Sequence, residues 1–220
     1  FKAGIEGDLF YLTRLPSGRK PIFIVLIVQS FAEEANKSRY AISQIAQRIT
    51  GLGGGGVLYD HFGTGDSAGD HGEATLATWA QDLHNCILDL KMTNDCPIHL
   101  FAIRAGALIT MSLATTAFEN IASVSFLNPV LNGKQFIGQF FRLRLAADLF
   151  GDSDNKVTMA DIRTELSESG VTEIAGYSLG VNLVSEFEAF SLDEKLDTAP
   201  GLLGNCEINW LELNTQEKES

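Results

Sequence analysis

Two kinds of hydrophobic pattern alternate along the chain. Runs dominated by apolar residues lie at 22–28, 57–59, 98–103 and 124–127. Runs this short, apolar on both faces, are typical of buried strands in a parallel sheet. Between them, apolar residues recur three and four positions apart, which predicts amphipathic helices. This alternation of strand and helix predicts an α/β protein with a mostly parallel sheet and helices on both faces.

The alternation stops after Pro129. Helical patterns rich in Phe and Leu fill much of 131–191, and a strand pattern returns only at 208–213. We therefore expect 131–191 to form a helical cap insertion over a core made of 1–130 and 192–220. Four aromatic residues in and beside the helical stripes pack against the core or line an apolar acyl pocket: Phe136, Phe140, Phe141 and Phe150.

Composition and charge exclude several classes of protein. The chain has 16 Lys and Arg against 28 Asp and Glu, a net charge of −12. This charge argues against nucleic-acid binding and against docking on anionic membranes. The longest aliphatic run, 22–28, is too short for a membrane span, and no signal-peptide pattern opens the sequence. Three cysteines without CxxC spacing fit a reducing cytoplasm, so we expect a cytoplasmic protein without a cofactor.

The segment 102–106 carries the most specific chemical signal. It joins a predicted strand to a predicted helix, with Ala102, Ala105 and Gly106 around a central Arg104. Small residues in this pattern are typical of a nucleophile elbow, the strained turn that presents the nucleophile of a hydrolase. Arg104 stands where a serine hydrolase has its serine. Its guanidinium stays protonated, so it cannot act as a nucleophile.

Four segments resemble known families. The loop DHFGTGDSAG at 60–69 resembles the loop after the fourth strand of the α/β-hydrolase fold. FAEEANKSR at 31–39, FAIRAGAL at 101–108 and EIAGY at 173–177 are similar to segments of the exosortase A system-associated hydrolase 2 family. The resemblance covers nearly the whole chain. It implies an α/β-hydrolase-fold protein, esterase- or thioesterase-like, that serves bacterial exopolysaccharide or surface-protein assembly, here without the final strand and helix of that fold.

A serine triad in this fold needs Ser, an acid and His in that chain order. All four histidines precede the elbow: His61, His71, His84 and His99. The acidic candidates after the last predicted strand, Glu212 and Glu217, have no histidine to orient. The sequence therefore predicts no working triad.

Two interpretations of Arg104 stay open. It forms an ion pair with Glu33 or Glu34, or it anchors a carboxylate or phosphate of a ligand, and the two roles can coexist. The predicted pocket contains Phe31, Ala32, Glu33, Glu34, Arg104, Ala105 and Asn128. Three functions fit: a hydrolase with an altered site acting on a small or acylated substrate, a non-catalytic protein that binds an anionic or acylated ligand, and a scaffold for a partner.

Weaker signals concern metals and self-association. Five residues of one glycine-rich loop suggest a hard-metal site, although an exposed polar loop is favoured: Asp60, His61, Asp66, Asp70 and His71. The segment 152–157 begins like a calcium loop but lacks the Gly and Glu of that motif, so no metal site is predicted. The strand pattern at 208–213 forms an exposed edge, which predicts a homo-oligomer.

Overall fold

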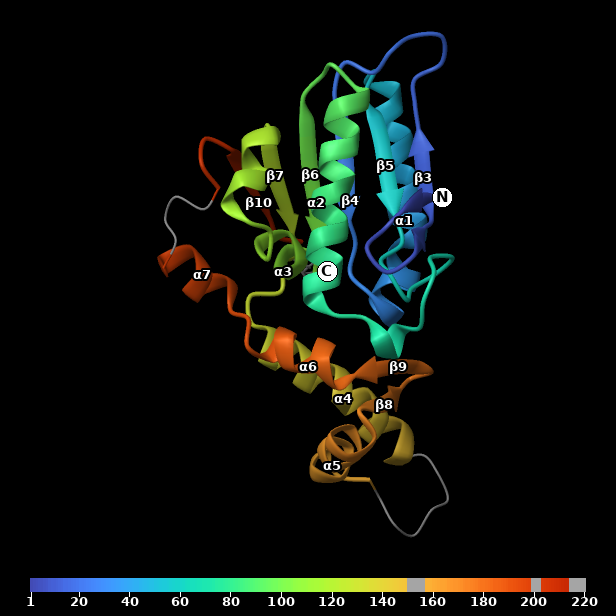
Figure 1. Cartoon of the computed structure of the whole chain (residues 1–220), viewed down its shortest axis with the longest axis vertical. Helices are drawn as coiled ribbons and strands as arrows, with labels where there is room; N and C mark the ends of the chain where they lie inside the picture. Colours follow the sequence, from blue (N-terminus) through green and yellow to red (C-terminus); the bar gives the residue numbers. More distant parts are fainter. Residues whose placement is uncertain (150–156, 199–202, 214–220) are drawn as a thin grey trace, which may run out of the picture.

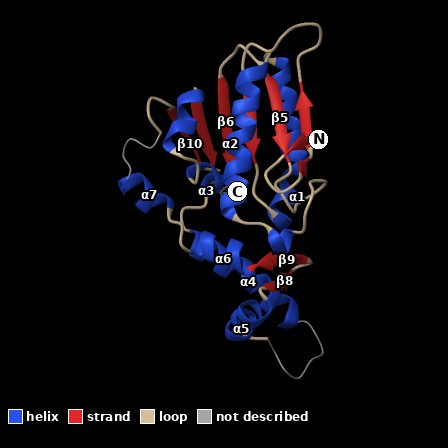
Figure 2. Ribbon diagram, viewed as in Figure 1, coloured by secondary structure: helices blue, strands red, loops and turns tan. Residues whose placement is uncertain are grey.

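A computed structural model describes residues 1–149, 157–198 and 203–213. Its centre is a six-stranded sheet with the order β10-β7-β6-β4-β5-β3 (Figures 1 and 2). Five neighbouring strands run parallel, and β3 pairs antiparallel with β5. The strands are β3 (Tyr11–Arg14), β4 (Ile24–Val28), β5 (Gly55–Tyr59), β6 (Ile98–Ile103), β7 (Ser123–Leu127) and β10 (Glu207–Leu211). The predicted mostly parallel sheet is confirmed.

Helices pack on both faces of this sheet, as the sequence predicts. On one face α2 (Leu76–Thr93) and α3 (Gly106–Met111) share a large apolar core with the strands. On the other face α1 (Ala32–Gly51) packs Ile42 and Ala46 against Ile27. Figure 1 shows α2 in front of the strands and α1 at the side of β5. The apolar stripe of each helix is therefore the stripe that it buries.

The glycine run between α1 and β5 is part of the strand pairing. The sequence predicts that the run 51–56 ends the first helix. In the structure α1 ends at Gly51, while Gly55 and Gly56 already belong to β5. A Cβ added to Gly56 would lie 3.1 Å from the Cβ of Ala46 on α1. Glycine is thus favoured here because helix and strand pack closely.

The segment 131–191 lies beyond the carboxyl ends of the parallel strands (Figure 1). It holds α4 (Gly133–Leu149), α5 (Met159–Ser169), β8 (Val171–Ile174), β9 (Tyr177–Gly180) and α6 (Val181–Glu188). The sequence predicts a helical insertion here and no strands, so the antiparallel β8–β9 hairpin is a difference. Its two turn residues, Ala175 and Gly176, have φ angles of 52° and 83°, the left-handed backbone that short hairpin turns need.

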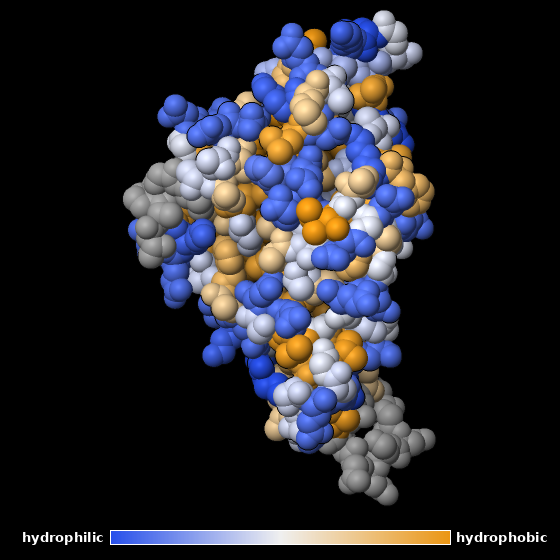
Figure 3. Space-filling model, in the orientation of Figure 1, coloured by the Kyte–Doolittle hydropathy of each residue, from blue (hydrophilic) through white to orange (hydrophobic). Residues whose placement is uncertain are grey.

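Smaller elements complete the described chain. They are β1 (Lys2–Ala3), β2 (Asp8–Leu9), the 3-10 helices η1 (His71–Glu73) and η2 (Thr115–Asn120), and α7 (Leu192–Thr198). Among the described residues, no helix combines the length and apolar character needed to cross a membrane. On the face drawn in Figure 3, hydrophobic side chains form small patches separated by hydrophilic ones.

Candidate functional site

Arg104 occupies a strained turn between β6 and α3. Its φ angle is 53°, a left-handed conformation that residues with a side chain rarely adopt. Ala105 is fully buried, and a Cβ on Gly106 would collide with the backbone oxygen of Val28. The small residues around Arg104 therefore allow the helix to start directly against the neighbouring strand. This is the close packing expected of an elbow.

The guanidinium of Arg104 is held by two groups. Nε and Nη2 donate to Glu34 Oε1 at 3.1 and 2.9 Å, and Nη1 donates to the backbone oxygen of Asn128 at 3.3 Å. The predicted ion pair is confirmed, with Glu34 as the partner. The side chains of Arg104 and Glu34 are 38% and 31% exposed, so water reaches the pair.

Glu34 is held in place by a second contact. Ser30 Oγ donates to Glu34 Oε2 at 2.8 Å. Sequence reasoning missed this contact, although the spacing of four residues at the start of a helix is the available signal. Glu33 instead pairs with Lys37 at 3.2 Å, away from the elbow. One of the two acidic candidates thus belongs to the site, and the other lies on the outer surface of α1.

Three residues that follow adjacent strands have strained, left-handed backbone conformations. Ala32, Arg104 and Asn128 follow β4, β6 and β7, and their φ angles are 55°, 53° and 43°. Each such conformation costs on the order of 1–3 kcal/mol and persists only where the surrounding structure holds it. Asn128 is held by two bonds: its N–H donates to the Leu211 oxygen, and its Oδ1 accepts from the Leu213 N–H, both at 2.8 Å. Strain of this kind clusters at functional sites.

Three of the predicted pocket residues are buried and do not line an open pocket. Phe31 is buried against the rings of Trp79, Phe136 and Phe187, with centroid distances between 5.2 and 5.6 Å. Ala32 and Ala105 are buried as well. The pocket residues that meet at an accessible point are therefore Glu34, Arg104 and Asn128.

The aromatic residues of the cap segment form an interface with the core. Phe136, Phe140 and Phe141 are all buried, and the first two pack on Phe31. Of the two alternatives left open by the sequence, the cap-to-core interface is the one that the described residues support. Phe150 lies outside the described residues. Burying rings of this size stabilises the docking of the cap, because each ring removes a large apolar area from water.

The buried histidines serve packing. His61 is fully buried, stacks on Trp79, and has its Nε2 3.0 Å from the Gln29 oxygen. Burial lowers the pKa of His61 to about 4. His71 also has a lowered pKa because of burial, and its Nδ1 lies 2.5 Å from the Ser178 oxygen on β9. Neither ring is hydrogen-bonded to a group at the elbow.

A serine–histidine pair exists at the other end of the sheet. His99 Nδ1 lies 2.7 Å from Ser123 Oγ, at the amino ends of β6 and β7. Sequence reasoning did not single out Ser123. The pair is across the sheet from the carboxyl ends, where ligands of open parallel sheets bind. It therefore lies at the opposite end of the strands from the elbow at Arg104.

The loop after β5 is organised by hydrogen bonds. Asp60 accepts from Gln29 Nε2 at 3.0 Å, from the Asp66 N–H at 3.1 Å and from Arg39 at 3.3 and 3.4 Å. Within residues 1–149, 157–198 and 203–213, no three His, Cys, Asp or Glu side chains form a group that could hold a metal ion. Residues 152–156 of the calcium-like segment, and Glu217, lie outside the described residues.

Solved structures with a similar arrangement include hydrolases. Est1E from Butyrivibrio proteoclasticus, solved with ferulic acid bound, aligns with a TM-score of 0.63 and 13% identity, covering 96% of this chain and 87% of that one. A soluble variant of monoglyceride lipase from Saccharomyces cerevisiae aligns with a TM-score of 0.61 and 11% identity, covering 96% and 84%. Mouse alpha/beta hydrolase domain-containing protein 10 aligns with a TM-score of 0.57 and 11% identity, covering 96% of this chain and 86% of that one. The chain has the α/β-hydrolase fold.

A curated sequence relative covers a smaller region. The "Putative carbamate hydrolase RutD" of Azorhizobium caulinodans is 33% identical over 88 residues, which are 40% of this chain and 32% of that protein. The aligned region thus spans about a third of that relative. No protein-family model matches the chain.

Proposed function

We propose that this α/β-hydrolase-fold protein binds an anionic or acylated ligand at Arg104 and does not hydrolyse esters through a serine triad. The observation that carries the proposal is the occupant of the elbow. A guanidinium paired with Glu34 stands at the strained position between β6 and α3, where the fold presents a nucleophile. His61, His71 and His99 make their hydrogen bonds away from the elbow.

Arg104 retains hydrogen-bonding capacity for a ligand. A guanidinium carries five N–H donors, and the contacts with Glu34 and Asn128 use three of them. The two remaining donors belong to Nη1 and Nη2, whose parallel N–H groups suit the two oxygens of a carboxylate or phosphate. Because the side chain is 38% exposed, an incoming anion can reach it while Glu34 keeps the guanidinium in place.

The resemblance to exosortase-associated hydrolases supports a choice of first ligands. Acylated or anionic saccharides, as in exopolysaccharide assembly, and short carboxylates are the compounds to test. As part of the same proposal we place this protein in the cytoplasm, because its three cysteines are not arranged in CxxC spacing.

Binding is tested by isothermal titration calorimetry with acetate, butyrate and acetyl phosphate. Wild type is expected to bind at least one of them, and Arg104→Ala to lose that binding. Arg163→Ala is the matched control, because Arg163 also pairs with a carboxylate, Glu188, at 2.7 Å but on the cap. Equal binding by wild type and Arg104→Ala would overturn the proposal.

The absence of a serine triad is tested separately. Arg104→Ser restores the residue type of a hydrolase, yet it has no histidine base among the described residues that is hydrogen-bonded at the elbow. We expect wild type and Arg104→Ser to hydrolyse p-nitrophenyl esters at background rate and to resist a fluorophosphonate probe. Stoichiometric labelling of one serine in wild type would contradict this expectation.

A hydrolase with an altered site is the second candidate, and the solved lipase with a similar fold favours it. In that reaction Glu34 would accept a proton from the attacking water, since it is the carboxylate nearest to the elbow guanidinium. This candidate requires ester or thioester turnover that Glu34→Gln abolishes. The binding proposal requires no turnover in either protein.

A further inference from the structure

Charge is distributed unevenly along this acidic chain. Residues 9–59 contain six of the 16 Lys and Arg but only two of the 28 Asp and Glu. Those two acids, Glu33 and Glu34, are both engaged in ion pairs near the start of α1. The end of β3, the loop that follows it and the last turns of α1 therefore carry cations with no acidic residue among them.

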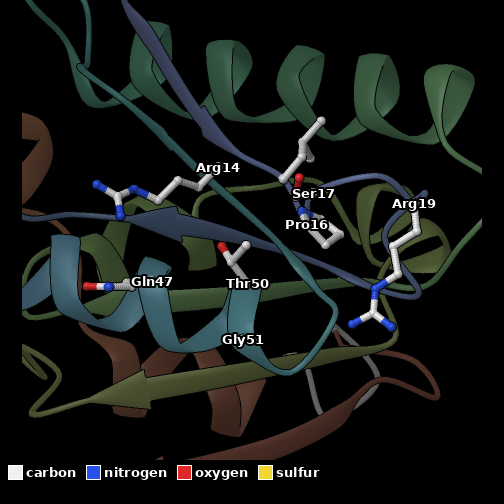
Figure 4. A pocket seen from close by; sticks show the side chains of 8 residues that line it. Arg14, Pro16, Ser17, Arg19, Gln47, Thr50 and Gly51 are labelled. Atoms are coloured by element: carbon white, nitrogen blue, oxygen red, sulfur yellow. The ribbon is translucent and has the colours of Figure 1, made fainter.

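A hollow of about 650 Å³ opens in this basic region, at the amino ends of the parallel strands. Figure 4 shows Arg14 and Arg19 at its two ends, with Thr50 of α1 between them and Gln47 of α1 at the end where the Arg14 guanidinium lies. Leu15, Pro16, Ser17 and Gly51 complete the lining. No acidic side chain lines the hollow, and neither arginine has an ion-pair partner within the described part of the chain.

A smaller hollow of about 100 Å³ adjoins the first one. Arg14 lines both, so its side chain stands at their boundary. The small hollow lies between β3, β5 and α1. Most of its lining residues are apolar or glycine, namely Leu12, Ile42, Ala46, Gly56 and Leu58, and Arg39 and Ser43 complete the lining. Its volume is of the order needed for one aromatic ring or a short aliphatic chain. The two hollows thus offer a charged compartment beside an apolar one.

We propose that the two hollows form a binding site for an organic phosphate. The phosphate lies between Arg14 and Arg19, and an apolar group of ring size occupies the small hollow. Two guanidiniums match the double charge and the several oxygens of a phosphate monoester better than the single charge of a carboxylate. Ser17 and Gln47 supply further donors, whereas the Thr50 hydroxyl already donates to the Ala46 oxygen.

This site is independent of the function proposed at the elbow. Arg14 pairs in register with Gly56 near the start of β5, whereas Arg104 follows the end of β6. Because β5 and β6 run parallel, these two positions lie at opposite ends of the strands. Loss of one binding activity therefore leaves the other measurable.

The proposal is tested by calorimetric titration with phenyl phosphate, inorganic phosphate and phenol at low ionic strength. Wild type is expected to bind phenyl phosphate at least about tenfold more tightly than inorganic phosphate, and not to bind phenol. Arg14→Ala and Arg19→Ala are each expected to weaken phenyl phosphate about tenfold. Leu12→Ser is expected to weaken phenyl phosphate while inorganic phosphate binds as before.

Arg48→Ala is the matched control. Arg48 is exposed and lies in the last turn of α1, but it lines neither hollow. It is expected to leave the affinity within twofold. An equal loss in Arg48→Ala and Arg14→Ala would show diffuse charge attraction and overturn the proposal, as would an absence of phenyl phosphate binding at 10 mM, a concentration near the weak limit of specific recognition.

A second experiment distinguishes a lipid headgroup from a free small molecule as the source of the phosphate. Vesicles of phosphatidylcholine with 20% phosphatidic acid, about the anionic content of a charged membrane surface, are sedimented with wild type and with Arg14→Ala. Displacement of phenyl phosphate by these vesicles identifies a lipid headgroup as the source. Binding of phenyl phosphate without vesicle binding identifies a free small molecule, and both results keep the phosphate site.

Discussion

At the scale of single residues, Arg104 combines an ion pair with an unfavourable backbone. Replacing it by Ala removes the pair with Glu34 and keeps a Cβ at a φ of 53°. Because both partners are about a third exposed, we expect a loss of about 1 kcal/mol in the free energy of unfolding, not the 3–5 kcal/mol of a buried pair. Arg104→Gly loses the same pair but relieves the backbone, so it should be more stable than Arg104→Ala by about 0.5–1 kcal/mol.

Urea unfolding of the three proteins measures both differences. A loss of more than about 3 kcal/mol in Arg104→Ala would mean that Glu34 becomes a buried, unpaired charge. A less stable Arg104→Gly than Arg104→Ala would contradict the strain assigned to this turn.

His61 makes the stability of the fold depend on pH. Burial lowers its pKa in the folded protein to about 4, below its unfolded value near 6.5. The unfolded chain therefore binds a proton first as the pH falls, and folding loses stability between about pH 6.5 and pH 4. Below pH 4 both states are protonated and the loss from this group stops growing. We expect a contribution of up to about 3 kcal/mol.

Denaturant unfolding at a series of pH values, compared between wild type and His61→Gln, isolates this contribution. The variant removes the titrating ring, so its unfolding free energy should fall less between pH 6.5 and pH 4. Parallel pH curves for the two proteins would mean that His61 is solvated in the folded state.

At the scale of elements, the β8–β9 hairpin depends on its turn. Ala175 has a φ of 52° and is exposed. Ala175→Gly is therefore expected to stabilise the protein by about 0.5–1 kcal/mol, because glycine adopts this conformation without steric cost. The measurement is the melting temperature by calorimetry.

The control for this change is Ala189→Gly. Ala189 is exposed and has a φ of −78°, which any residue adopts. Glycine at position 189 relieves no backbone strain, and it adds conformational entropy to the unfolded chain, so the melting temperature should fall. If both changes lower the melting temperature equally, the positive φ of Ala175 is not a source of strain.

The hairpin also connects the cap to the core. Tyr177 Oη accepts from Asn36 Nδ2 on α1 at 2.5 Å, and the Ser178 oxygen lies beside His71 of η1. Together with the aromatic interface around Phe31, these contacts hold the segment 131–191 against the carboxyl edge of the sheet. The cap position is therefore set by residues that are far apart in the sequence.

At the scale of the whole molecule, β10 is an edge strand with exposed apolar side chains. Ile208, Trp210 and Leu211 are 50%, 42% and 45% exposed, and β10 pairs with β7 alone among the described strands. An edge of this kind pairs readily with a second chain. We propose that this chain forms homo-oligomers through β10, and expect sedimentation to show concentration-dependent association.

Ile208→Lys tests this association, since a charge on an edge strand opposes pairing between chains. The variant should sediment as a monomer at concentrations where wild type associates. Thr116→Lys, on the exposed part of η2, serves as a control for the added charge. A wild type that stays monomeric at high concentration would contradict the prediction.

Local patterns in the sequence determined the parallel strands of the sheet, the helices on both faces and the elbow. Runs such as 98–103 identify buried strands because burial on both faces demands apolar residues throughout, and the small residues around Arg104 identify a turn with no room for larger ones. The identity of residue 104 alone excludes a serine nucleophile there.

Only the tertiary structure decided which residues meet. The sequence left Glu33 and Glu34 equivalent, and α1 directs Glu34 toward an arginine 70 residues away. It suggested Phe31 as a pocket residue, whereas rings from α2, α4 and α6 bury it. It gave no sign that Arg14 and Arg19 share a hollow with α1. Periodicity records which face of an element is apolar, but the neighbours of that face depend on strand order and register, which are contacts between distant residues.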